Sequence, residues 1–284
     1  MPVIVNNRNL LTDEDLKIWE RDGYAVVRGL WSPEEVAQCQ AAFDTFAMLG
    51  KAIPDQWDPD PSSERPWERC PRVMHPHRIK GEPFRELSLK MLLDKRVEAV
   101  VAALMGEAPI ATQSMFYYKP PGSQGQALHQ DNIYLQVRPK TCVAAWTAID
   151  RSHKDNGGLY VCPGTQDLEL QCPQQADAED SYSGHYVPPP KGCEEVALTL
   201  EKGDVLFFNG SVIHGSKSNT TKDEWRRSLI CHYAPASAKE INDFYRPSLN
   251  FDGSDFSNYE SSSDAGGPCG DDRAFVPPVS YVTT

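Results

Sequence analysis

Long hydrophobic runs, an excess of basic residues and targeting signals are all missing from this 284-residue sequence. Its longest apolar stretch, near residues 97–105, is far too short to span a membrane. Lys and Arg number 28 against 40 Asp and Glu, and the formal charge of −12 argues against a general nucleic-acid binder, because an acidic surface repels phosphate backbones. No signal peptide, lipidation motif or peroxisomal signal is visible, so we expect a cytoplasmic protein without a membrane partner.

Paired cysteines are missing as well. The eight cysteines are scattered along the chain without a Cys-x-x-Cys motif, which argues against a zinc knuckle or a redox dithiol. In a chain of this length they are too few for a disulfide scaffold. We therefore expect reduced thiols, in keeping with a cytoplasmic location.

What the sequence does have is the composition of one globular domain, 40% hydrophobic and 24% charged. Residues 1–107 are expected to be mostly helical, with an early strand at 24–27. Helix starts are indicated by Thr12 before three acidic residues and by Ser32 before a proline, and a further helix is expected over 84–105.

Short β-type runs take over in residues 108–245 and predict a sandwich or barrel. The turn Asn156-Gly157-Gly158 predicts a hairpin between two of them. A polar insertion at 166–194, expected to be a lid or disordered, interrupts this core, and a polar tail follows at 246–284. The predicted strands cover residues 110–119, 127–137, 142–149, 158–162, 195–200, 205–208 and 226–233.

The first candidate for chemistry is His129-Gln130-Asp131, which lies inside one predicted strand. Residues i and i+2 of a strand point to the same face, so the imidazole and the carboxylate can converge on one metal ion. A triplet of this kind also arises by chance, and His153-Lys154-Asp155 is a second copy. Because that copy precedes a turn among polar residues, we interpret it as solvated.

A third metal ligand is available at His214, which follows the apolar run 205–208 and a turn. Two histidines and one carboxylate on one side of a metal leave three positions open, a geometry that suits non-heme Fe(II) and dioxygen. Arg226, in the last β-type run, could hold a dicarboxylate through a bidentate contact. Arg226 and Arg227 face opposite sides of a strand, and the hydrophobic pattern alone leaves open which one points inward.

Further short motifs accompany these residues in a consistent order between Met115 and Ala234. They are Leu128-His129-Gln130-Asp131, Ala145-Trp146-Thr147-Ala148, Asn156-Gly157-Gly158, Pro163-Gly164-Thr165, Lys202-Gly203-Asp204 with Phe207-Phe208, His214-Gly215-Ser216, and Arg226 with Cys231-His232-Tyr233. Together with an amino-terminal Asp22-Gly23-Tyr24, this stretch resembles the phytanoyl-CoA dioxygenase family of Fe(II)/2-oxoglutarate-dependent oxygenases. The spacing from His214 to Arg226 is one residue longer than in close relatives.

The resemblance implies a mainly β fold with flanking helices around a double-stranded β-helix (jelly-roll, cupin-like) core. It implies His129, Asp131 and His214 as Fe(II) ligands, with 2-oxoglutarate and O2 as cosubstrates that become succinate and CO2. It also implies that Arg226 pairs with the distal carboxylate of 2-oxoglutarate. Other residues at family positions around the cosubstrate are Met115, Trp146, Ser216 and, through its backbone, Gln130.

Contacts to the substrate are less well defined by the sequence. Tyr117 lies on the same strand face as Met115, two residues earlier, so it is a candidate to line the mouth of the active site. Family members also use a basic or polar residue ahead of the barrel. His75 or His77 could be this residue, and an ordinary surface histidine is the alternative for both. His232, in the last predicted strand, is interpreted as structural.

The sequence therefore predicts an oxygenase that hydroxylates a small organic metabolite. Desaturation, ring closure and epoxidation stay open, whereas halogenation is disfavoured because halogenating relatives lack the carboxylate that Asp131 supplies. The acidic balance slightly favours a neutral or cationic substrate over a CoA ester. The alternatives are a catalytically inert, metal-holding jelly-roll that binds small molecules or partners, and an AlkB-like nucleic-acid demethylase, which the charge opposes. The oligomeric state stays open.

Overall fold

The structure is a computed structural model that describes residues 10–54, 56–60, 62–64, 70 and 72–262. Two antiparallel sheets form its centre, in the arrangement of the double-stranded β-helix that the sequence predicts. The larger sheet has the order β1 (Tyr24–Val27), β10 (Val205–Asn209), β5 (Val143–Ala148), β12 (Ser228–Pro235), β3 (Pro109–Tyr117), β14 (Ser248–Leu249), β15 (Asp255–Phe256), with β2 (Arg72–Met74) also beside β3. The smaller sheet has the order β4 (Gln126–His129), β11 (His214–Ser216), β6 (Leu159–Val161), β9 (Val196–Ala197).

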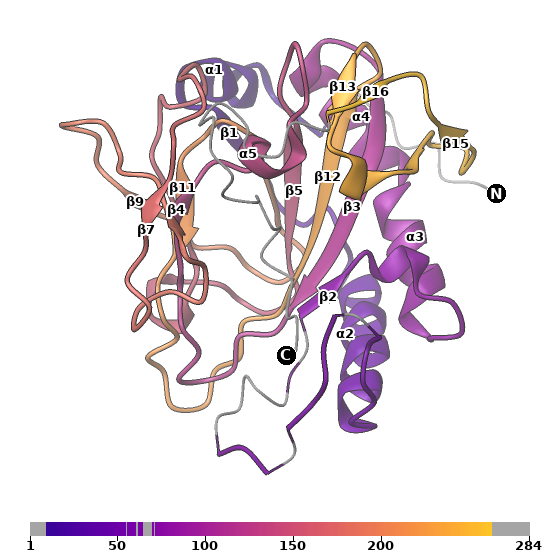
Figure 1. The fold of residues 1–284 in the computed structure, drawn as a ribbon, viewed down its shortest axis with the longest axis vertical. Helices are drawn as coiled ribbons and strands as arrows, with labels where there is room; N and C mark the ends of the chain where they lie inside the picture. The colour runs from indigo at the N-terminus through magenta and orange to yellow at the C-terminus, as the bar shows by residue number, and fades with distance from the viewer. Residues whose placement is uncertain (1–9, 55, 61, 65–69, 71, 263–284) are drawn as a thin grey trace.

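Helices cover the outer face of the larger sheet, on the side away from the smaller sheet (Figure 1). They are α2 (Pro33–Met48), α3 (Phe84–Leu92) and α4 (Lys95–Met105), whereas α1 (Asp13–Asp22) lies at the top of this view next to β1. The main apolar core lies between these helices and the sheet, where the Phe43 ring stacks between Phe84 of α3 and Phe116 of β3. The inner face of the larger sheet is therefore left to face the smaller sheet.

Capping side chains define where several of the helices begin. Thr12 and Ser32 cap α1 and α2 through capping boxes, as predicted. The single helix expected over 84–105 is wrong, because the Asp94 side chain accepts a hydrogen bond from the Arg96 amide and starts a second helix there.

The amino-terminal strand belongs to the larger sheet of the core. Gly23 ends α1 with a φ of 78°, and a Cβ atom at this position would lie 2.5 Å from the Val212 side chain. The strand β1 that follows pairs with β10 along its whole length. Arg28 then forms an ion pair with Asp204, so the amino-terminal motif and the Lys202-Gly203-Asp204 motif meet in space.

Two local predictions for the barrel are wrong. The strand predicted over 127–137 ends at His129 and is followed by the short helix α5 (Asn132–Leu135). The Asn156-Gly157-Gly158 turn does not close a hairpin, because β5 before it and β6 after it lie in different sheets. It follows the 3-10 helix η4 (Lys154–Asn156), and its backbone crosses from one sheet to the other.

The insertion at 166–194 is ordered against the edge of the smaller sheet. Its strands β7 (Gln174–Gln175) and β8 (His185–Tyr186) form a hairpin, and the Val187 amide donates to the Leu128 carbonyl at 2.7 Å. In the region expected to be a polar tail, Leu249 of β14 pairs with β3, and β16 (Glu260–Ser261) pairs with β13 (Glu240–Ile241). Residues 263–284 lie outside the described residues.

The expectation of reduced thiols is wrong at Cys172, which is disulfide-bonded. The free cysteines are Cys39, Cys70, Cys142, Cys162, Cys193 and Cys231, and Cys269 lies outside the described residues. The cytoplasmic location loses this support and stays a prediction. None of the helices in the described part of the chain combines the length and apolar character that a membrane span requires.

Candidate metal centre and cosubstrate pocket

The smaller sheet brings the three proposed metal ligands together. His129 ends β4 and His214 begins β11, and their Cα atoms are direct partners across the two strands. Asp131 has left the strand and stands just before α5 with helical backbone angles (φ −63°, ψ −35°). Its convergence with His129 therefore comes from the turn into α5 and not from strand alternation. One ligand atom of each residue lies within 4.8 Å of the others, and all three residues are buried.

The hydrogen bonds of the two histidines show which nitrogens are available to a metal. His129 Nδ1 lies 2.9 Å from the Ala127 carbonyl and His214 Nδ1 lies 3.0 Å from the Val212 carbonyl. Carbonyl oxygens only accept hydrogen bonds, so each Nδ1 carries a proton and Nε2 is the ring nitrogen that could bind a metal. Both Nε2 atoms lie close to Asp131 Oδ1, at 3.3 and 3.5 Å. This donor set fits a divalent metal ion.

The site also holds the charge states that metal binding needs. Burial lowers the pKa of His214 to about 4, which outweighs the attraction of Asp131 and keeps the imidazole neutral at physiological pH. Burial opposes ionisation of Asp131, but the neighbouring His214 and His232, with the hydrogen bond from His232, hold the pKa of the carboxyl well below its usual range. The site thus offers an ionised carboxylate together with the neutral imidazole of His214.

A buried guanidinium lies in the same cavity as the metal ligands. Arg226 is 4% exposed and bonds the Ser228 hydroxyl at 2.9 Å, while its Nε has no partner among the described residues. Its Cζ lies 5.4 Å from the centroid of the Trp146 ring. Burial lowers the pKa of Arg226 to about 10, so it stays charged at neutral pH. A buried cation that forms no ion pair with a described acidic residue fits an anionic ligand such as a carboxylate.

The neighbouring Arg227, which like Arg226 lies just ahead of β12, points the other way. It forms ion pairs with Asp150 and with Asp44. The structure thus directs Arg226 into the cavity and Arg227 away from it, which decides the alternative that the hydrophobic pattern leaves open.

Lys119 supports the cosubstrate side of the cavity from behind. Its ammonium donates to the Ser216 hydroxyl at 2.8 Å and to two backbone carbonyls. Burial, with Arg226 and Arg72 nearby, lowers the pKa of Lys119 well below its usual range. Room for this side chain depends on Gly157, where a Cβ atom would lie 2.6 Å from Lys119 Cδ. The Asn156-Gly157-Gly158 motif therefore helps to position Ser216, because it leaves room for Lys119.

The other residues that the sequence singles out divide into two groups. Met115, Tyr117, Trp146 and Ser216 line the cavity together with the metal ligands and Arg226. Gln130 and His75 do not. The Gln130 side chain points to the insertion, where it bonds the Gln171 amide and the Ser211 carbonyl, and a backbone contact to the cosubstrate stays a prediction.

His75 packs behind the cavity wall. Its ring lies 5.2 Å from Phe244 and 6.0 Å from Tyr245, measured between centroids, and Tyr245 lines the cavity in its place. His77 is also buried and bonds the Ser114 hydroxyl at 2.6 Å, so neither histidine is the expected surface residue.

Sequence reasoning missed the residue that supplies positive charge from the segment ahead of the barrel. Arg72 of β2 lines the cavity, and its Cζ lies 3.3 Å from the centroid of the Tyr182 ring. Tyr182 comes from the insertion, and its hydroxyl donates to Gln126 at 2.5 Å. The Gln126 amide in turn lies 3.0 Å from His129 Nε2. The pairing of β2 with β3, which places Arg72 beside Tyr117, is a tertiary contact without a local signal.

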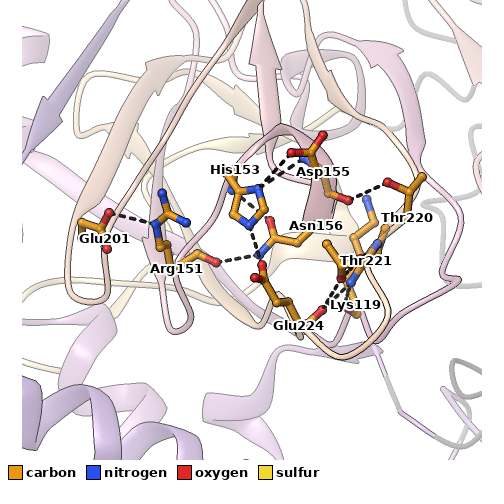
Figure 2. A network of polar contacts seen from close by, with 10 residues as sticks. Lys119, Arg151, His153, Asp155, Asn156, Glu201, Thr220, Thr221 and Glu224 are labelled. Carbon is orange, nitrogen blue, oxygen red and sulfur yellow. Dashed lines mark hydrogen bonds and ion pairs between the residues drawn. The ribbon is translucent and has the colours of Figure 1, made fainter.

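The second His-x-Asp triplet makes a surface network instead of a metal site (Figure 2). His153 Nε2 lies 2.5 Å from a Glu224 carboxylate oxygen, and the largely exposed Asp155 contacts His153 and Thr220. Among the described residues this pair belongs to no group with metal-binding geometry. The interpretation as a solvent-facing pair agrees with this arrangement.

Comparison with known proteins places these features in a family. The sequence profile of phytanoyl-CoA dioxygenase (PhyH) matches residues 19–228. The chain belongs to the phytanoyl-CoA dioxygenase family. It is 30% identical to the peroxisomal phytanoyl-CoA dioxygenase of Bos taurus over 247 residues, covering 82% of this chain and 72% of that protein. As a member of this family it is an iron- and 2-oxoglutarate-dependent oxygenase that uses O2.

Solved structures share the family fold at lower identity. The epimerase SnoN in complex with Fe3+, alpha ketoglutarate and nogalamycin RO has a TM-score of 0.62 and 21% identity, with 82% of this chain and 85% of that chain covered. EctD from S. alaskensis in its apoform has a TM-score of 0.63 and 21% identity, with 81% and 79% covered. These likenesses confirm the predicted fold class.

Proposed function

We propose that this member of the phytanoyl-CoA dioxygenase family hydroxylates a small organic molecule at a C–H bond, with 2-oxoglutarate and O2 converted to succinate and CO2. The observation that carries the proposal is the arrangement within one cavity. The Nε2 atoms of His129 and His214 lie beside Asp131 Oδ1, and the buried Arg226 lies in the same cavity without an ion pair to a described acidic residue. Iron held by the three ligands would supply the activation of dioxygen.

The protein would bind and orient 2-oxoglutarate and shield the cavity from water. Arg226 would pair with the distal carboxylate of 2-oxoglutarate, and its place above Trp146 fixes the direction of the guanidinium. Lys119 would hold the Ser216 hydroxyl toward the same ligand. We also propose that the insertion at 166–194 covers the cavity, since Tyr182 reaches Gln126 and Arg72 from it.

The substrate that this cavity favours is neutral or anionic. Two arginines, Arg72 and Arg226, line the cavity, and Asp131 is the one carboxylate among its described lining residues. A metal ion would compensate Asp131 and 2-oxoglutarate would pair with Arg226, so the charge on the substrate side is that of Arg72, beside Tyr182. The acidic balance of the whole chain therefore does not extend into the cavity, and it gives no support to a cationic substrate.

The alternatives have less support. A catalytically inert binding module would not need the complete set of metal ligands or a cosubstrate cation, and both are present. The net charge of −12 continues to disfavour a nucleic-acid substrate. The cytoplasmic location stays a prediction from the sequence.

The test begins under anaerobic conditions with the metal-free protein. Addition of Fe(II) and then 2-oxoglutarate should produce the visible charge-transfer band of the chelate, and Asp131→Ala should not. A folded, metal-loaded wild-type protein without this band would contradict the proposal. Succinate release is then screened with neutral and anionic metabolites, and the product is analysed by mass spectrometry. Gain of one oxygen atom supports hydroxylation, whereas loss of two hydrogen atoms would indicate desaturation instead.

A further inference from the structure

The two carboxylate oxygens of Asp131 lie in different surroundings. Oδ1 faces the metal-binding nitrogens, 3.3 Å from His129 Nε2 and 3.5 Å from His214 Nε2. Oδ2 points the other way and lies 2.9 Å from His232 Nε2. One oxygen of the carboxylate therefore faces the metal position, and the other contacts His232.

His232 is the donor in this contact. A carboxylate oxygen that faces an imidazole nitrogen at hydrogen-bond distance accepts, so His232 Nε2 carries the proton. His232 is 2% exposed, and its Nδ1 has no partner among the described residues. Its side chain thus makes one hydrogen bond within the described structure, and that bond goes to the proposed metal ligand.

The backbone of His232 is hydrogen-bonded within the larger sheet, next to an irregularity in the pairing of β12 with β3. It lies within β12, between Gln113 of β3 on one side and Ala144 of β5 on the other. Its carbonyl also accepts a hydrogen bond from the Thr112 hydroxyl at 2.9 Å. The imidazole is therefore presented to Asp131 from the middle of the larger sheet, while the metal ligands come from or next to the smaller sheet.

We propose that His232 is a positioning residue that keeps Asp131 a ligand through one oxygen only. A carboxylate can bind a metal through one oxygen or through both. The facial arrangement of two histidines and one carboxylate leaves three positions free, and 2-oxoglutarate and O2 need all of them. A second oxygen from Asp131 would fill one of these positions. The hydrogen bond to His232 holds Oδ2 away from the metal.

This role predicts opposite effects on metal and cosubstrate binding. Without the donor, Oδ2 is free to turn toward the metal, so metal affinity should stay the same or rise. The affinity for 2-oxoglutarate should fall by about 10-fold or more, the order of effect that outer partners of metal ligands show. A histidine that only supported the fold would give a different pattern, in which metal and cosubstrate affinity fall together with stability.

The experiment compares wild type with four variants. His232→Phe keeps a ring but removes the donor, and His232→Leu repeats the test if the larger ring impairs folding. His232→Gln keeps an N–H donor and should restore behaviour toward wild type. His77→Leu is the matched control, because it removes a buried histidine that bonds Ser114 and does not line the cavity.

Three quantities are measured for each protein. They are the dissociation constant for Co(II) with its visible absorption spectrum, the dissociation constant for 2-oxoglutarate from the anaerobic Fe(II) band, and the thermal midpoint of the metal-free protein. We expect His232→Phe to bind Co(II) at least as tightly as wild type, with a changed Co(II) spectrum and weakened 2-oxoglutarate binding. His77→Leu should change only the thermal midpoint.

Either of two results would overturn the proposal. One is a loss of Co(II) affinity in His232→Phe and His232→Leu alike, and the other is wild-type behaviour of both in all three measurements.

Because the proposal rests on the metal and 2-oxoglutarate site, its failure must be separable from failure of that site. A wild-type protein without the Fe(II) band would refute the site, whereas a normal wild-type band with an unchanged His232→Phe band would refute the role of His232. The Co(II) spectrum reports on the carboxylate without 2-oxoglutarate.

Discussion

His129 and His214 are direct Cα partners across β4 and β11, and the centroids of their imidazole rings lie 4.3 Å apart. Strand pairing in the smaller sheet therefore sets the spacing of the two histidine ligands before any metal binds. Each ring is further fixed by a hydrogen bond from Nδ1 to a backbone carbonyl two residues earlier in the chain. Sites built on paired strands with fixed rotamers are preorganised, and we expect the metal-free protein to keep this geometry.

The two His-x-Asp triplets allow a matched test of the metal site. Asp131→Ala should reduce metal affinity by about 100-fold or more, because it deletes a ligand. Asp155→Ala should leave metal affinity unchanged, because Asp155 lies in the surface network of His153 (Figure 2). Calorimetric titration with Co(II) measures both. Equal losses in the two variants would contradict the assignment.

Arg226→Met should weaken 2-oxoglutarate binding by about 30-fold or more, since breaking a buried, hydrogen-bonded charge pair costs about 2–5 kcal/mol. The Michaelis constant for 2-oxoglutarate should rise while metal affinity stays unchanged. Arg227→Met is the control, because Arg227 pairs with Asp150 and Asp44 away from the cavity. It should lower the free energy of unfolding by roughly 1–3 kcal/mol and leave 2-oxoglutarate affinity intact. An equal loss of 2-oxoglutarate affinity in both variants would show a general effect of removing an arginine.

Gly157→Ala should disturb the cosubstrate side through Lys119. The added methyl group meets Lys119 Cδ at 2.6 Å and also strains a backbone with a φ of 80°. Gly192→Ala carries the same kind of strain at a φ of 87° but meets no atom within 4 Å. We expect a cost in unfolding free energy of about 1–3 kcal/mol at Gly192 and a larger one at Gly157. Only Gly157→Ala should also weaken 2-oxoglutarate binding, and equal behaviour of the two variants would exclude a role for this contact.

The ion pair of Glu35 with Arg96 predicts a defined pH dependence of stability. The hydrogen bond from Arg96 lowers the pKa of Glu35, against the effect of partial burial. A carboxyl with a lowered pKa stabilises the folded state above its unfolded pKa, and this contribution disappears as the pH falls through the folded pKa. Glu35→Gln, which can keep the capping bond to Ser32, should lower the free energy of unfolding at pH 7 by about 0.5–1 kcal/mol.

Urea unfolding at a series of pH values tests this prediction. The difference between wild type and Glu35→Gln should shrink as the pH drops below about 4.3, the ordinary pKa of a glutamate. A double-mutant cycle with Arg96→Met isolates the pair. A difference that stays constant with pH would assign the effect to packing of the amide and not to the charge.

Features that depend on residues close together in the chain could be predicted from the sequence. Thr12 and Ser32 start their helices because a cap needs only a side chain and an amide three residues away. The proposed site residues could be recognised for a similar reason, because they lie in short local motifs. These residues are His129, Asp131, His214 and Arg226. The family, fold class and cofactors followed from these motifs.

The tertiary structure alone decided the contacts that cross from one strand or segment to another. Arg72 reaches the cavity because β2 pairs with β3, and Tyr182 reaches it because the insertion folds back over β4. The contact of His232 with Asp131 joins the two sheets, so its role as more than a structural residue has no counterpart in the local pattern. Burial and hydrogen-bond partners depend on atoms distant in the sequence, and only the fold brings those atoms together.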